Sequence, residues 1–236
     1  MSADFKMTKG DMDFYLNELA KLLKKTYGKN FEAEIIVVGG GAIMAGYSFR
    51  QMTADIDAII QAKAQIKDEI YKVADKFNLP SDWLNSDFMR TESYSAKLSQ
   101  VSKVYKSFCN GILTVRVMDA EYLIAMKMKS FRPYKKDLSD VVGIIGEHVK
   151  RGSPITNNDI VKAYKTLYDE ELSVAAKEFL ERVFASKAIE QLYSDVCVYE
   201  VNNKKSLVRF VEEYPKAPIE DNLGEIMKLL QNQERQ

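Results

Sequence analysis

A run of glycines and a closely spaced pair of aspartates point most directly to chemistry in this chain. Gly39, Gly40 and Gly41 follow an apolar run, and Asp55 and Asp57 come shortly afterwards with one residue between them. Because glycine has no Cβ, backbone N–H groups at such a turn can close on a phosphate. In a strand, residues i and i+2 project to the same side, so the two carboxylates lie together, their Cα atoms about 7 Å apart. A divalent cation usually relieves their repulsion, so the combination indicates Mg²⁺-dependent chemistry on a nucleotide.

The glycine run has a plainer interpretation as well. It matches neither the Gly-x-Gly-x-x-Gly dinucleotide fingerprint nor a P-loop, and glycines at a strand–helix junction often form only a tight turn. We expect a helix over residues 41–49 whose N-terminal amides face the glycine turn. Helix N-termini bind anions, which favours a phosphate site.

The acid pair also has two interpretations. An isolated Asp-x-Asp can be the solvated edge of a strand. Here the flanking Ile56 and the apolar residues 58–60 predict a buried strand, where two acids would be costly without a cation. Thr53, just before the pair, could fix a turn or hydrogen-bond a carboxylate.

Hydrophobic periodicity predicts an α/β (α+β) fold with a mixed sheet flanked by helices and followed by a helical C-terminal region. The Asn110-Gly111 pair predicts a two-residue hairpin joining antiparallel strands. We expect two domains, residues 1–150 and 151–236, separated by a linker at 151–154, with a capping box at Thr156 opening the second. The expected helices cover 11–27, 41–49, 64–77, 120–131, 137–149 and most of the rest apart from 200–205; the expected strands cover 34–38, 55–60, 101–108 and 112–117.

Composition limits the class of protein. The 236 residues are 46% hydrophobic, enough for a substantial core. The formal net charge of zero argues against a surface devoted to nucleic acid, although a local basic patch is compatible with it. Two distant cysteines predict neither disulfides nor a zinc site. Without an apolar stretch of membrane-spanning length or a signal-peptide pattern, we expect a cytoplasmic protein with no membrane partner.

Residues 127–136 are basic without an acid among them. Such a run is often a solvated helix face, but it could also place positive potential beside the acid pair for a triphosphate or an RNA end. Asp137, which follows, could simply cap the next helix. A cap would not exclude a catalytic role.

The glycine turn, the Asp-Ile-Asp motif and the later segments 50–57, 79–85, 121–127 and 137–140, with Arg132, resemble a known group of proteins. They resemble the nucleotidyltransferase superfamily related to polymerase beta. Within it, they resemble a branch of uncharacterised bacterial proteins similar to the nucleotidyltransferase toxins of type IV toxin–antitoxin systems. The resemblance covers about residues 30 to 147.

The resemblance implies roles for individual residues. Asp55 and Asp57 would hold one or two Mg²⁺ ions, and Asp137 would be the late acid, our hypothesis for the acceptor of the substrate's proton. Asp140 would lie beside Asp137. The implied nucleotide-binding residues are Gly39, Gly40, Gly41, Thr53, Lys127 and Arg132, the last two as cations on the triphosphate.

One departure from the superfamily concerns a third carboxylate on a neighbouring strand. Residues 112–117 carry Thr114 and Arg116 on one face and no acid before Asp119. Either Asp119 or Asp137 replaces the missing ligand, or it is absent. We therefore expect transfer of a nucleotidyl group from an NTP to a hydroxyl of an unknown RNA, protein or small molecule. The alternatives are a catalytically degenerate nucleotide- or RNA-binding protein, which could belong to a toxin–antitoxin pair with an antitoxin partner, and a partner-binding scaffold.

Overall fold

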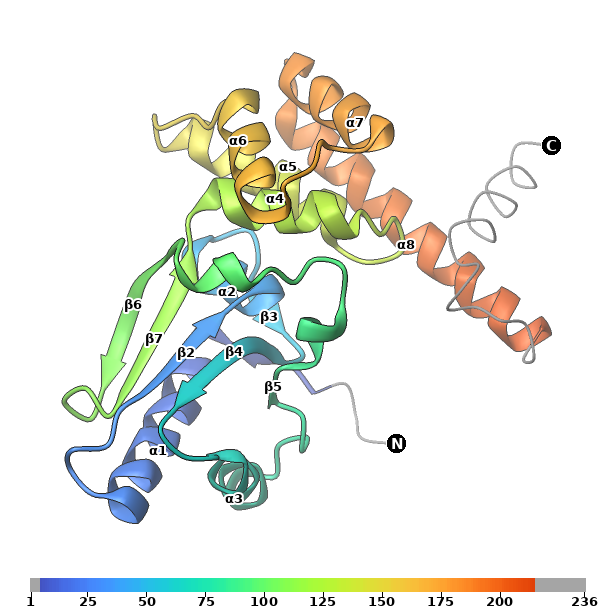
Figure 1. Cartoon of the computed structure of the whole chain (residues 1–236). Coiled ribbons are helices and arrows are strands. Elements are labelled where there is room, and N and C mark those ends of the chain that lie inside the picture. Colours follow the sequence, from blue (N-terminus) through green and yellow to red (C-terminus); the bar gives the residue numbers. More distant parts are fainter. Residues whose placement is uncertain (1–4, 215–236) are drawn as a thin grey trace.

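A mixed five-stranded sheet forms the centre of the molecule in the computed structural model, which describes residues 5–214 (Figure 1). The strand order is β5-β4-β2-β7-β6. The central strand is antiparallel to β4 and parallel to β7, which confirms the predicted mixed α/β fold. The strands of this sheet are β2 (Ala33–Val37), β4 (Ile56–Ala62), β5 (Leu84–Asn85), β6 (Ser102–Phe108) and β7 (Leu113–Met118).

Helices cover the sheet and then continue as a helical region beyond it. The first five helices are α1 (Lys9–Tyr27), α2 (Gly39–Gly46), α3 (Lys67–Phe77), α4 (Ala120–Ser130) and α5 (Asp137–Lys150). The later ones are α6 (Asn157–Tyr168), α7 (Val174–Ala185) and α8 (Ile189–Glu213), and two short 3-10 helices, η1 (Asp87–Arg90) and η2 (Ala96–Ser99), lie between β5 and β6. Figure 1 shows α4 to α8 gathered at one end of the sheet, where α6 packs on α4 and α8 packs on α5. The division into two domains at residue 150 stays a prediction.

Two structural details position the glycine run and the acid pair. The central strand β2 is buried, with Ile35, Ile36 and Val37 inaccessible to solvent, as expected of a strand covered on both faces. A small antiparallel sheet of β1 (Met7–Thr8) and β3 (Met52–Thr53) fixes the segment just before the acid pair.

No helix within residues 5–214 has the length and apolar character needed to cross a membrane.

The predicted hairpin exists, but its loop is longer than expected. β6 and β7 are antiparallel, and Phe108 pairs with Leu113, so four residues rather than two form the connection. Cys109, Asn110 and Gly111 all have positive φ values. Three successive left-handed residues lengthen the turn beyond the two-residue loop that Asn-Gly usually favours.

The predicted helix break at residues 200–205 is wrong, because α8 runs through it without interruption. Glu200 is only 4% exposed, and its Oε1 accepts hydrogen bonds from the Leu138 and Ser139 N–H groups at 2.8 and 3.1 Å. These N–H groups belong to the first turn of α5, where helix donors have no partner within the helix. A tertiary contact therefore overrides the weak helix propensity of this polar segment.

Removing the Glu200 cap should destabilise the protein. We expect Glu200→Ala to lower the free energy of unfolding by about 1–2 kcal/mol, because two buried N–H groups lose their acceptor. Glu200→Gln keeps an acceptor oxygen and should lose less. Urea denaturation of both variants measures this, and equal losses would show that the capping contact is not what matters.

Candidate active site

The glycine run lies against the acid pair. Gly39, Gly40 and Gly41 form the first turn of α2, so the helix begins two residues before the predicted start and ends at Gly46 rather than at residue 49. Gly39 has a φ of 58°, in the left-handed region that favours glycine. A Cβ on Gly39 would lie 3.3 Å from Oδ2 of Asp57. The fold thus brings the predicted phosphate turn and the predicted metal ligand side by side.

The amides of this turn are suited to an anion. Val38 precedes α2 as its N-cap residue and provides no side-chain cap, because its side chain has no acceptor. The first N–H groups of a helix lack partners within the helix and carry partial positive charge. A phosphate oxygen is a ligand that such a turn can hold.

Arg50 covers Gly40. A Cβ on Gly40 would clash with Nη2 of Arg50 and would lie 3.0 Å from Oγ1 of the buried Thr53. The guanidinium is held by Asp140, whose two carboxylate oxygens accept hydrogen bonds from Nη1 at 2.7 and 2.6 Å. Nε of Arg50 is buried without a hydrogen-bond partner in the described part of the chain. The glycine at position 40 therefore lets a fixed cation lie beside the anion-binding turn.

Asp55 and Asp57 are both partly buried, Asp55 immediately before β4 and Asp57 within it. Burial and the neighbouring Asp55 raise the pKa of Asp57 to about 6, although Lys127 and Arg132 oppose the rise. Burial also raises the pKa of Asp55, with Asp82 adding to the rise and Lys135 and Arg50 opposing it. Two carboxylates that resist ionisation together are a site that a cation would stabilise.

Further acidic and polar groups approach the pair from the edge of the sheet. Asp57 pairs in register with Asn85 of β5, and Asn85 lowers the pKa of Asp55. Asp87 contributes to raising the pKa of Asp57, as Asp82 does for Asp55. The surroundings of the pair are thus acidic on the β5 side and basic on the side of α4 and α5.

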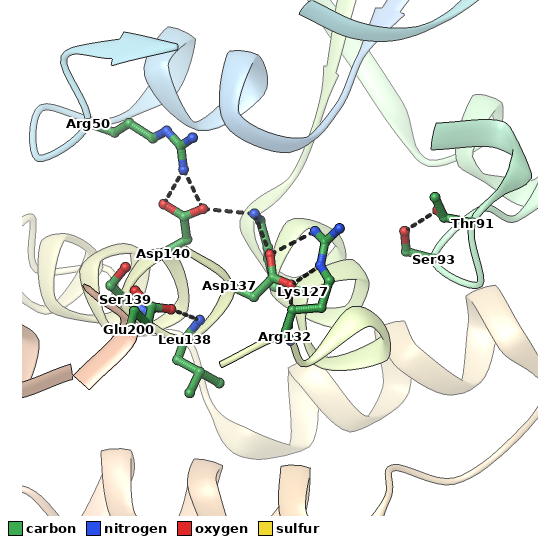
Figure 2. A network of polar contacts seen from close by, with 10 residues as sticks. All are labelled: Arg50, Thr91, Ser93, Lys127, Arg132, Asp137, Leu138, Ser139, Asp140 and Glu200. Carbon is green, nitrogen blue, oxygen red and sulfur yellow. Dashed lines mark hydrogen bonds and ion pairs between the residues drawn. The ribbon is translucent and has the colours of Figure 1, made fainter. Parts of the chain in front are cut away.

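Figure 2 shows a chain of alternating charges on the basic side. Nζ of Lys127 lies 2.9 Å from Oδ1 of Asp137 and 2.8 Å from Oδ2 of Asp140, and Asp140 in turn binds Arg50. Nε of Arg132 donates to Oδ2 of Asp137 at 2.8 Å. Three cations share two buried carboxylates, so the network carries a net positive charge next to Asp57.

Burial and neighbouring charges have opposite effects on the pKa values of Lys127 and Asp137. Burial alone would lower the pKa of Lys127, but Asp140 and Asp137 outweigh it and hold the pKa above its usual value. Burial would raise the pKa of Asp137, but Lys127 and Arg132 hold it below the usual value. Lys127 and Asp137 are therefore both charged at neutral pH, and the Lys127 side chain is only 12% exposed.

The basic residues of the 127–136 run have different partners in the structure. Lys127, Arg132 and Lys135 all lower the pKa of an acid-pair carboxylate, which fits the interpretation of positive potential at the site. Lys129 instead forms an ion pair with Glu170. Only part of the run is thus directed at the candidate site.

The predicted replacements for a third carboxylate have other partners. Asp119 forms an ion pair with Lys103, and the Asp137 carboxylate forms ion pairs with Lys127 and Arg132. Among residues 5–214, no group of three or more His, Cys, Asp or Glu side chains is arranged to hold a metal ion. The acid pair therefore contributes two carboxylates without a third from the described chain.

Sequence reasoning gave no role to Arg50 and none to Glu200. Arg50 lies five residues before Asp55, and only its proximity to the motif could have indicated it. The sequence indicates Asp140 only as a neighbour of Asp137, whereas in the structure Asp140 joins Arg50 to Lys127. Glu200 lies more than 140 residues beyond the acid pair in the sequence, and nothing in its local sequence indicates a contact with α5.

The mixed sheet thus carries a glycine turn and an acid pair at one strand end, with a network of cations beside them. A sequence model of the family described as "Nucleotidyltransferase of unknown function (DUF6036)" matches residues 14–149, more than half of the chain, and the chain belongs to this family. The membership implies a nucleotide substrate. No curated protein and no solved structure matches the chain.

Proposed function

We propose that the protein is a Mg²⁺-dependent nucleotidyltransferase that moves a nucleotidyl group from an NTP to an acceptor hydroxyl. The observation that supports this most strongly is the closeness of the glycine turn to Asp57, whose Oδ2 would lie 3.3 Å from a Cβ built on Gly39. It joins an anion-binding turn to a carboxylate pair, the two parts that a metal–triphosphate requires.

The donor set fits Mg²⁺. Asp55 and Asp57 offer oxygen ligands, and burial, which raises the pKa of each, favours a cation bound between them. When bound there, Mg²⁺ would neutralise charge on the phosphates during in-line displacement at the α-phosphorus. With two carboxylates from residues 5–214, the remaining ligands would be phosphate oxygens and water.

The triphosphate would lie on the amides of the glycine turn. Arg50, fixed by Asp140 beside Gly40, is placed to contact it, and Arg132 is the more exposed cation of the network. Lys127 is bonded to two buried carboxylates. We therefore propose that Lys127 acts mainly by holding Asp140, and through it Arg50, in place. Its charge also lowers the pKa of Asp57.

Asp137 is poorly suited to accept the proton of the acceptor hydroxyl. It is fully buried, its pKa is held low, and Lys127 and Arg132 occupy its oxygens. A general base needs access to the substrate and a pKa near the working pH. We propose instead that Asp137 positions the two cations.

Label transfer from NTPs tests the reaction class. Incubation with each NTP labelled at the α-phosphate, in Mg²⁺, should label an acceptor, whereas the same NTP labelled at the γ-phosphate should label none. Transfer of the γ-label would show phosphoryl rather than nucleotidyl transfer. Absence of any transfer, together with absence of Mg–NTP binding, would remove the proposal.

Two glycines of α2 provide a matched pair for testing the turn. Gly40→Ala places a Cβ against Arg50 and Thr53, whereas a Cβ on Gly46 meets nothing within 4 Å. We expect Gly40→Ala to weaken Mg–NTP binding about tenfold, and Gly46→Ala to leave it unchanged. Calorimetric titration measures both, and equal affinities would contradict the placement of the triphosphate.

The shortage of carboxylates favours a second candidate, a protein that binds nucleotide or RNA without turnover. In that case the nucleotide-bound protein would regulate an antitoxin or another protein partner. Tight Mg–NTP binding without transfer to any RNA, protein or small molecule would favour this alternative over the enzyme.

A further inference from the structure

A groove runs along the outer edge of β4, on the far side of the sheet from β6. Its volume is about 870 Å³, and it lies between the second half of β4, the start of α3 and the loop of residues 81–87. Asp82, Asn85 and Asp87 line its loop end, and Asn85 pairs in register with Asp57 of β4. The groove therefore begins beside the acid pair.

The edge of β4 is covered only at its beginning. β5 pairs with Ile56 and Asp57 and goes no further. The next contact comes from Ser86, whose Oγ donates to the Ala58 carbonyl at 2.8 Å. Beyond Ala58, no described strand pairs with this side of β4.

The direction of the remaining backbone groups follows from the alternation of a strand. The Asp57 carbonyl accepts from Val38 N–H at 2.9 Å, so odd-numbered residues direct their backbone groups toward β2. The Ala58 carbonyl faces outward, and Ile60 and Ala62 share its direction. Both residues line the groove, so their N–H and C=O groups form an open strand edge within it.

The floor of the groove is apolar, and one of its ends is acidic. Tyr71 and the almost fully buried Ile66 and Ile70 line the α3 side of the groove. The end near the acid pair is acidic through Asp82 and Asp87. An open strand edge above apolar side chains is the surface to which extended peptides add as an extra strand.

We propose that this groove holds an extended peptide paired with Ile60 and Ala62, and that a Ser, Thr or Tyr hydroxyl of that peptide is the nucleotidyl acceptor. The inference rests on the proposed function and names the acceptor class for the same site. Ile60 lies three residues from Asp57, about 10 Å of extended chain, so a bound peptide can place a hydroxyl at the acid pair. The hydroxyl oxygen forms a bond to the α-phosphorus, the bond from that phosphorus to pyrophosphate breaks, and the hydroxyl proton passes to solvent.

The charges at the end of the groove near the acid pair favour a peptide over RNA; Lys63 and Lys67 line the other end, after β4 and at the start of α3. A phosphodiester chain in this groove would pass Asp82 and Asp87, and like charges repel. Basic side chains beside the acceptor hydroxyl would instead be attracted. Unpaired strand N–H and C=O groups also match a peptide backbone and have no regular counterpart in RNA.

Synthetic peptides test the inference. The probes are three nonapeptide libraries with Ser, Thr or Tyr fixed at the centre, each incubated with α-labelled NTP and Mg²⁺, and total RNA in a parallel reaction. We expect label in at least one library and none in RNA. Ala62→Pro removes an outward N–H without touching the bonds to β2, and Ala64→Trp fills the groove; each should reduce peptide labelling about five- to tenfold.

Controls separate this inference from the proposed function. Gln61→Ala lies outside the groove lining and should label peptides as the unmodified chain does. Thermal unfolding and Mg–NTP titration should show that Ala62→Pro and Ala64→Trp stay folded and bind nucleotide. Labelling of RNA alone, no labelling of any library, or full peptide labelling by both folded variants would overturn the inference. If Mg–NTP binding persists in those cases, the nucleotide site stands; if it is absent from the unmodified chain, the proposed function itself fails.

Discussion

Asp57→Asn should abolish nucleotidyl transfer while making the metal-free protein more stable. We expect turnover to fall about 100- to 1,000-fold, because the amide loses the negative charge that would hold Mg²⁺ against the phosphates. In EDTA at pH 8, the free energy of unfolding should rise by about 1–2 kcal/mol after allowance for partial exposure. Opposite effects of one substitution on activity and stability are expected of a functional site rather than a structural ion pair.

The stability gain should depend on pH. The folded-state pKa of Asp57 is about 6, above the ordinary 3.8, so the folded protein binds a proton more readily than the unfolded chain. Above pH 6 the ionised carboxylate destabilises the fold, and this cost disappears as the pH falls from 6 toward 4. Urea denaturation across this range measures the difference between the two proteins.

Asp75→Asn is the matched control, because Asp75 is an exposed aspartate of α3. Its nucleotidyl-transfer activity should equal that of the unmodified protein. An Asp57→Asn protein that transfers label as fast as the Asp75→Asn control would contradict the assignment of Asp57 to the metal.

Lys127→Met should cause the largest loss of stability, about 3–5 kcal/mol. Removing this ammonium leaves the buried carboxylates of Asp137 and Asp140 without the cation that joins them. Arg132 and Arg50 remain as single partners and cannot replace the bridge. Urea denaturation at pH 7 measures the loss, and Mg–NTP titration should show weaker binding, because Arg50 loses its fixed anchor.

Lys129→Met on the same helix tests whether the effect belongs to the network. Lys129 forms its ion pair with Glu170, a partly exposed residue outside the network. Surface pairs of this kind contribute about 0–1 kcal/mol. Similar losses for Lys127→Met and Lys129→Met would contradict a special role for the buried network.

Local patterns predicted most elements of this fold. The buried strand at β2 follows from a short, continuously apolar run, and the α6 start follows from the Thr156–Asp159 capping box, which the structure confirms. The antiparallel β6–β7 pair follows from the Asn-Gly turn. These predictions succeeded because the signals act between neighbours in the sequence.

The errors occurred where distant contacts decide the structure. The polar sequence of residues 200–205 predicts a break in the helix. In the structure Glu200 lies within α8, where its carboxylate binds the N-terminus of α5. Of the candidate site, the sequence predicted that Asp55 and Asp57 lie together and near the glycines. It did not reveal that Arg50 covers Gly40 or that Lys127 is buried, because both depend on how α4 and α5 pack against the end of the sheet.

Calorimetric titration with each of the four NTPs, as α,β-methylene analogues that cannot transfer a nucleotidyl group, tests the central claim most directly. The claim is that the glycine turn and the acid pair form a single Mg–nucleotide site. We predict saturable binding of at least one analogue in Mg²⁺, lost in EDTA and lost in the Asp55→Asn/Asp57→Asn double variant. Binding that is independent of Mg²⁺, or that the double variant retains at full affinity, would contradict it.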